Sequence, residues 1–106
     1  MGGMRATIDG RKADRARLWK LMEEACAEIS DDARLMPEDG CIAWFLLYGK
    51  VCRIRRTLFG TLVLDRVPEL QYDRAIAFGE ALERRGFRVH MRLGFYPSED
   101  MTQTGA

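Results

Sequence analysis

The chain has 106 residues, of which 47% are hydrophobic and 31% charged, and its formal net charge is +1. These values suit a single soluble domain, and they exclude both a disordered polar segment and a protein that attracts polyanions through its overall charge. Because no apolar run is long enough to cross a bilayer and no apolar signal region opens the chain, we expect a cytoplasmic protein without a membrane partner.

The metal-binding and redox residues are few. Three cysteines, Cys26, Cys41 and Cys52, form no closely spaced pair, and His90 is the only histidine. This pattern argues against a zinc site or a cofactor site, and it favours cysteines that serve as small core residues in a reducing compartment.

Residues 1–10 contain three glycines and no hydrophobic period, so we expect a flexible arm there. A helix is predicted from Ala13 to Ile29, because apolar residues recur at helical spacing. Basic residues gather at its start and acidic residues at its end, which is the reverse of what the helix dipole favours. Two interpretations stay open: a solvated helix face, or a secondary basic patch for an anionic partner at Arg11, Lys12 and Arg15.

Residues 30–40 are rich in turn-forming and acidic side chains, and the sequence predicts a connection there. The acidic residues match no calcium-loop spacing, which favours a hydrated loop over a metal site.

The stretch 41–56 predicts a β-hairpin that organises the rest of the chain. Residues 42–48 and 51–55 have strand-like composition, and Gly49-Lys50 suits a two-residue turn because glycine accepts the positive φ at its first position. Side chains alternate along a strand, so this turn fixes which residues share a face. The predicted cross-strand pairs are Tyr48 with Val51, Leu46 with Arg53, and Trp44 with Arg55.

The chain then reverses at residues 57–60, or else continues the strand with a bulge at Gly60; the sequence leaves both open. A third strand is predicted over residues 61–66. A second helix begins at Pro68, contains Gly79 where it approaches the sheet closely, and ends before Gly86. Residues 87–93 alternate as a fourth strand, and residues 97–106 form a polar tail that we expect to be disordered.

The predicted order α-β-β-β-α-β gives an α+β fold over residues 11–96. It is a two-layer sandwich whose four-stranded, mostly antiparallel sheet carries both helices on one face. The opposite face gathers aromatic and basic side chains. The candidate binding residues on it are Trp44, Tyr48, Arg53, Arg55, Arg88, His90 and Arg92.

These residues favour a small non-enzymatic binding protein: a regulator, inhibitor or adaptor of the kind that phages and mobile elements encode. It would dock an acidic or anionic partner, since tyrosine, tryptophan and arginine are common interface anchors. The alternative function is single-stranded nucleic-acid binding, with bases stacked on Trp44 and Tyr48. A third interpretation is that the arginines only keep an open sheet soluble, and an edge strand could also pair two copies into a homodimer.

Catalysis has little support in the sequence. His90 lies in a strand between two arginines, and Cys52 is assigned to the other face of the sheet, so a Cys–His pair is not expected. No phosphate-binding loop or paired-carboxylate spacing is present, and we expect neither enzymatic activity nor a cofactor.

Overall fold

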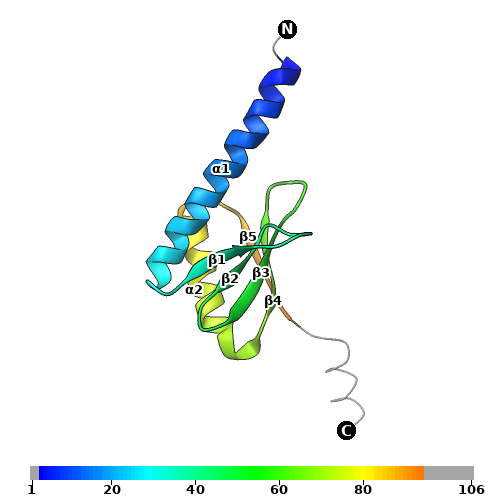
Figure 1. Cartoon of the computed structure of the whole chain (residues 1–106). Coiled ribbons are helices and arrows are strands. Elements are labelled where there is room, and N and C mark those ends of the chain that lie inside the picture. The colour runs from blue at the N-terminus through cyan, green and yellow to red at the C-terminus, as the bar shows by residue number, and fades with distance from the viewer. Residues whose placement is uncertain (1–2, 95–106) are drawn as a thin grey trace, which may run out of the picture.

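The computed structural model describes residues 3–94, with side chains from Asp14 onward. Five strands form one sheet, and two helices pack against it (Figure 1). The predicted tail at 97–106, and the side chains of Arg11 and Lys12, lie outside the described part of the chain. The elements in order are α1 (Gly3–Ile29), β1 (Arg34–Pro37), β2 (Ala43–Leu46), β3 (Lys50–Arg56), β4 (Leu62–Val67), the 3₁₀ turn η1 (Glu69–Gln71), α2 (Tyr72–Arg84) and β5 (Val89–Leu93).

The strands lie in the sheet in chain order. The first four form an antiparallel meander, and α2 carries the chain across to β5, which pairs in parallel with β4. The predicted α+β class, the two-layer arrangement and the parallel last strand are therefore confirmed. The number of strands is wrong, because a fifth strand, β1, lies within the segment that the sequence predicts as a loop.

Strand β1 is short and lies at one edge of the sheet, where it pairs only with β2. It ends at Pro37, a residue that sheets tolerate at an edge because its missing N–H need not join a second ladder. Because β1 has only four residues and is flanked by acidic, turn-forming residues, its sequence does not show the alternation that identifies longer strands.

Helix α1 begins at Gly3 and not at the predicted Ala13, so it includes most of the segment expected as a flexible arm. Its acidic end has a tertiary partner that explains the inverted charge order. Glu28 accepts hydrogen bonds from the guanidinium groups of Arg84, the last residue of α2, and of Arg85, which caps it, and the Glu24 carboxylate lies 3.6 Å from Arg85 Nε. The ion pairs between helices offset the unfavourable interaction of these carboxylates with the dipole of α1.

The core lies between the helices and one face of the sheet. Phe45 of β2 and Phe78 of α2 stack with ring centroids 4.2 Å apart and an interplanar angle of 2°. The predicted core-facing residues of the sheet all contribute to this core. Five are buried in it (Phe45, Leu47, Ile54, Leu62 and Leu64), and three pack against it partly buried (Phe87, Val89 and Met91).

Helix α2 ends as the sequence predicts. Gly86 has a φ of 95°, its N–H donates to Glu83 O at 3.0 Å, and the N–H of Phe87 donates to Leu82 O at 3.2 Å. This is the Schellman arrangement, in which a residue without Cβ takes the left-handed conformation after the helix. Gly79 faces the sheet, but a Cβ there would lie 3.4 Å from Leu64 Cδ1, an ordinary contact distance, so the approach is not close enough to require glycine.

The hairpin between β2 and β3 has a different turn from the predicted one. Leu47, Tyr48 and Gly49 form a three-residue loop, with φ values of 56° at Tyr48 and 118° at Gly49. Trp44 consequently pairs with Arg53 and not with Arg55. The shift is even, so it preserves the faces: Trp44, Arg53 and Arg55 still point the same way, because strand side chains alternate with a period of two.

Candidate functional site

One face of the sheet is covered by neither of the two described helices. Both helices contribute to the core on the other side, and Figure 1 shows them together on that side. We call the uncovered surface the open face. By strand register and alternation it comprises Arg34, Met36, Trp44, Leu46, Lys50, Arg53, Arg55, Val63, Asp65, His90 and Arg92.

The open face has an apolar layer beneath a basic one. Trp44 is only 7% exposed and Val63 is also buried, although no helix covers them. The ammonium group of Lys50 lies 4.8 Å from the centroid of the Trp44 ring, and Val63 lies between Arg55 and His90 on the neighbouring strands. Long basic side chains thus cover the apolar residues with their stems and keep their charges in water.

Among the described residues of the open face, Asp65 is the single acidic one, and it holds two of the arginines. Its Oδ2 atom accepts hydrogen bonds from Arg53 Nη2 at 3.2 Å and from Arg55 Nε at 3.0 Å. The other oxygen, Oδ1, accepts the backbone N–H of Arg66 at 2.8 Å. Partial burial alone would raise the pKa of this carboxyl. The hydrogen bonds from Arg53 and the Arg66 N–H, with the charges of Arg55 and Arg53, lower it below its ordinary value.

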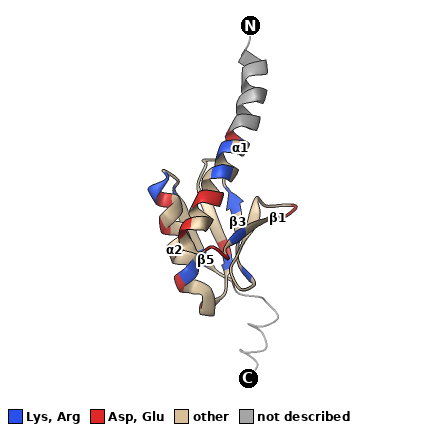
Figure 2. Cartoon of the chain, turned by 60° about the vertical axis from the view of Figure 1, so that its left-hand side comes forward, with Lys and Arg blue, Asp and Glu red and all other residues tan. Residues whose placement is uncertain are grey.

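The same carboxylate fixes a β-bulge. Asp65 and Arg66 of β4 together lie opposite Arg92 of β5, and Arg66 has a φ of 56°, an uncommon value for a residue with a side chain. Next to the bulge, the N–H of Gly94 donates to Val67 O at 2.9 Å. The open-face arginines and the end of β5 are therefore linked through one carboxylate. The arginines of β3 that Asp65 holds are among the basic residues coloured blue in Figure 2.

Within the described part of the chain, two buried donors on the open face have no hydrogen-bond partner. They are Trp44 Nε1 and Arg53 Nε, which belong to directly paired residues of β2 and β3. A buried donor without an acceptor costs about 1–3 kcal/mol, so native structures usually supply one.

The structure brings most of the predicted site residues together. Trp44, Arg53, Arg55, His90 and Arg92 share the open face, as the alternation predicted. Arg88 is exposed and lies just before β5, where its carbonyl accepts the N–H of Leu62 at 2.8 Å.

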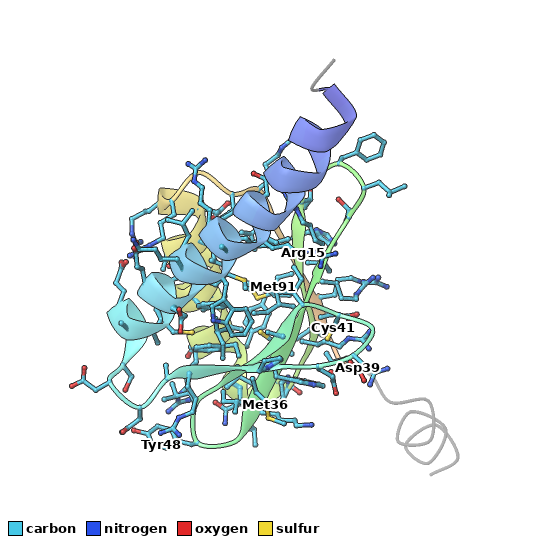
Figure 3. The ribbon with its side chains drawn as sticks, turned by 45° about the horizontal axis from the view of Figure 1, so that its top comes forward. Arg15, Met36, Asp39, Cys41, Tyr48 and Met91 are labelled. Atoms are coloured by element: carbon cyan, nitrogen blue, oxygen red, sulfur yellow. The ribbon has the colours of Figure 1, made fainter. Side chains whose placement is uncertain are left out.

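Tyr48 does not share the open face, and this placement corrects the prediction. Its positive φ takes it out of the strand, it is 74% exposed, and its ring lies 5.8 Å from the guanidinium carbon of Arg74 on α2. It belongs to the helix side of the molecule. Of the predicted secondary patch, Arg15 is an exposed residue of α1, far from Tyr48 in Figure 3.

Sequence reasoning missed Arg34, Met36 and Lys50. Arg34 and Met36 lie on the unrecognised strand β1, and Lys50 was assigned to the turn. The sequence signal for β1 is the alternation of Arg34, Leu35 and Met36, in which Leu35 points to the core and its two neighbours to the open face. Three residues are too few to separate a strand from a loop.

Among the side chains that the structure describes, no three histidine, cysteine, aspartate or glutamate residues gather as a metal site requires. None of the described helices has the length and apolar character to span a membrane. Comparison of the chain with protein-family models, with curated proteins and with solved structures found no match.

Proposed function

We propose that the protein is a small non-enzymatic binding protein, acting as a regulator, inhibitor or adaptor, which docks an acidic segment of a protein partner on the open face. The observation that carries this proposal is the composition of the face. It presents five basic residues and one acidic residue on a sheet surface that no described helix covers.

The charges that remain available lie around the rim of the face. Arg53 and Arg55 are engaged by Asp65, whereas Arg34, Lys50 and Arg92 are exposed. The face also carries apolar residues, the exposed Met36 on the edge strand β1 and the buried Trp44 on β2. Exposed basic residues beside apolar ones favour a carboxylate-rich protein segment, because the charges guide association and the apolar residues exclude water on contact.

The two buried donors support the same partner chemistry. Trp44 Nε1 and Arg53 Nε are buried, so a carboxylate or carbonyl oxygen would accept from either only after the side chains that cover them, Lys50 among them, move aside. A hydrogen bond between charged groups is stronger than one between neutral groups, which favours a carboxylate at this position.

The alternative partner, single-stranded nucleic acid, has weaker support. Base stacking needs an accessible aromatic ring, but Trp44 is 7% exposed beneath Lys50, and Tyr48 lies on the helix side. The arginines could still contact phosphates, so an oligonucleotide belongs in the same experiment.

The test measures fluorescence anisotropy of a short labelled peptide rich in glutamate and tyrosine, and of a labelled oligothymidylate, at low and physiological ionic strength. We expect the peptide to bind more tightly than the oligonucleotide. Arg34→Glu combined with Arg92→Glu should weaken peptide binding by about tenfold or more, because two attractive charges become repulsive.

A matched variant changes the net charge equally on the covered side: Arg17→Glu combined with Lys20→Glu, both exposed on α1. It should retain most of the binding. Equal losses in the two double variants would show that only net charge matters, and no binding of the peptide at low ionic strength would refute the proposal. Tighter binding of the oligonucleotide would select the alternative.

A further inference from the structure

The turn between β3 and β4 displays two large apolar side chains. Leu58 is fully exposed and Phe59 is 87% exposed. The turn is held by hydrogen bonds from Thr57 N–H to Thr61 O at 2.9 Å, from Gly60 N–H to Thr57 O at 3.0 Å, and from Thr61 N–H to Thr57 Oγ1 at 3.1 Å. Single exposed apolar residues are common, but an adjacent pair held on a fixed turn indicates a contact surface.

A groove lies between α1 and the loop that joins β1 to β2. Its volume is about 650 Å³, within the ~300–1,000 Å³ range typical of binding pockets. Leu18, Trp19, Met22 and Ile42 give it an apolar floor. Figure 3 shows three of the other lining residues, Arg15 from α1 and Asp39 and Cys41 from the loop.

The turn and the groove lie at the same end of the sheet. Arg56, the last residue of β3, lines the groove and precedes Leu58 by two positions. A two-fold dimer needs this arrangement, because each subunit must present both the inserting group and the receiving site on one surface. We propose that the Leu58–Phe59 turn inserts into the groove of a second copy of this chain, reciprocally, to form a symmetric dimer.

The charges around the groove favour a second copy over an acidic partner. Among the side chains that the structure describes, the rim carries two basic residues, Arg15 and Arg56, and two acidic residues, Glu38 and Asp39. A rim with both signs is complementary to itself across a two-fold axis, whereas it would repel part of a uniformly charged partner. The open face lies on the other side of the sheet, so the dimer leaves it accessible.

The dimer should be weak and concentration-dependent. The groove and the turn together supply about half the ~20–30 residues per side of a standard interface. We therefore expect a dissociation constant in the micromolar range or above, on the order of 1–100 μM.

The first experiment is sedimentation equilibrium of the full chain across about 1 μM to 1 mM, a span that brackets this affinity. The wild type should pass from monomer to dimer. Leu58→Ser combined with Phe59→Ser should raise the dissociation constant by about a hundredfold or more, because both inserting side chains are lost. The matched control is Leu70→Ser, since Leu70 is 92% exposed on η1, and it should associate like the wild type.

The second experiment asks whether the turn occupies the groove. Of the three cysteines, Cys26 and Cys52 are buried and Cys41, in the groove, is partly exposed. The rate of Cys41 alkylation by iodoacetamide should fall about tenfold between monomeric and dimeric concentrations of the wild type. In the Leu58→Ser, Phe59→Ser variant the rate should not depend on protein concentration.

Three results would overturn the proposal. The chain could remain monomeric at the highest concentration, or a dimer could persist unchanged in the double serine variant, as an edge-strand dimer would. A wild-type dimer whose Cys41 reacts as fast as in the monomer would show that the groove stays open. Circular dichroism of the double variant at low concentration checks that it is folded, and Leu58→Ala with Phe59→Ala repeats the test if it is not.

Discussion

Asp65 lies directly opposite Arg53 across strands β4 and β3, with its Oδ2 atom 3.2 Å from the guanidinium Nη2. The same oxygen lies 3.0 Å from Arg55 Nε, two residues further along β3. Asp65 therefore has a structural role on the open face. It sets the positions of two arginines, and its second oxygen holds the bulge at Arg66.

Asp65→Asn should destabilise the fold. The amide cannot balance two guanidinium groups, and one of its two terminal atoms no longer accepts hydrogen bonds. We expect a loss of about 1–3 kcal/mol in the free energy of unfolding, measured by urea denaturation. Asp39→Asn, in an exposed loop, should change it by less than about 0.5 kcal/mol. Equal values for the two variants would mean that Asp65 does not hold the arginines in solution.

The lowered pKa of Asp65 predicts how stability depends on pH. In the unfolded chain this carboxyl titrates near its ordinary value of about 3.9. Below that pH the unfolded state binds a proton that the native state does not, so stability falls as pH decreases toward the native pKa. Urea midpoints measured from neutral pH down to about pH 3 should show this loss, with a smaller slope in Asp65→Asn. A variant slope as steep as that of the wild type would contradict the lowered pKa.

The Phe45–Phe78 stack joins β2 to α2 at the centre of the core, where both residues are fully buried. Phe78→Ala should cost about 3–5 kcal/mol, because it removes the stacking contact and leaves a cavity. Phe78→Leu keeps more of the volume and should cost less. Denaturation in urea gives both values, with the exposed Leu70→Ala as the control. A loss no greater than that of the control would show that the core repacks around the gap.

Two glycines should respond to alanine in opposite directions. A Cβ at Gly79 would lie at ordinary contact distances, 3.4 Å from Leu64 Cδ1 and 3.5 Å from Val89 Cγ1. Because alanine is the better helix former, Gly79→Ala should stabilise the protein by up to about 1 kcal/mol. A Cβ at Gly94 would clash with the backbone Cα of Arg66, so Gly94→Ala must displace the bulge and should destabilise. Thermal unfolding of both variants tests the two signs.

The cysteines predict a pattern of alkylation. Burial raises the pKa of the Cys26 thiol to about 12 and also raises that of Cys52. At Cys41, burial and then the hydrogen bond to Glu38 Oε2, at 3.3 Å, raise the thiol pKa. Mass spectrometry should find one modified thiol in the native protein and three after unfolding.

Glu38→Gln should accelerate the reaction of Cys41, because a lower pKa gives more of the reactive thiolate at a given pH. Asp39→Asn, at the neighbouring position, serves as the control and should react like the wild type. The comparison is made at protein concentrations low enough to keep the chain monomeric. Equal rates in the two variants would exclude the effect of the Glu38 hydrogen bond.

Local sequence patterns predicted the parts of the fold that local physics governs. The end of α2 at Gly86, the alternation of β5 and the core-facing positions of β3 and β4 follow from periodicity and from a residue without Cβ. The face on which Trp44 and Arg53 lie was also predictable, because shifting the register by two residues leaves every side chain on the same face of the sheet.

Only the tertiary structure decided the register of the hairpin, the placement of Tyr48 and the existence of β1. The apolar run before Gly49 permits either turn, and the two registers have the same alternation, so the pattern cannot distinguish them. Strand β1 forms because β2 offers a partner edge, and Asp65 meets Arg53 only because β3 and β4 pair at one offset. These features depend on contacts between segments distant in the chain, whose free energy is absent from any local stretch of sequence.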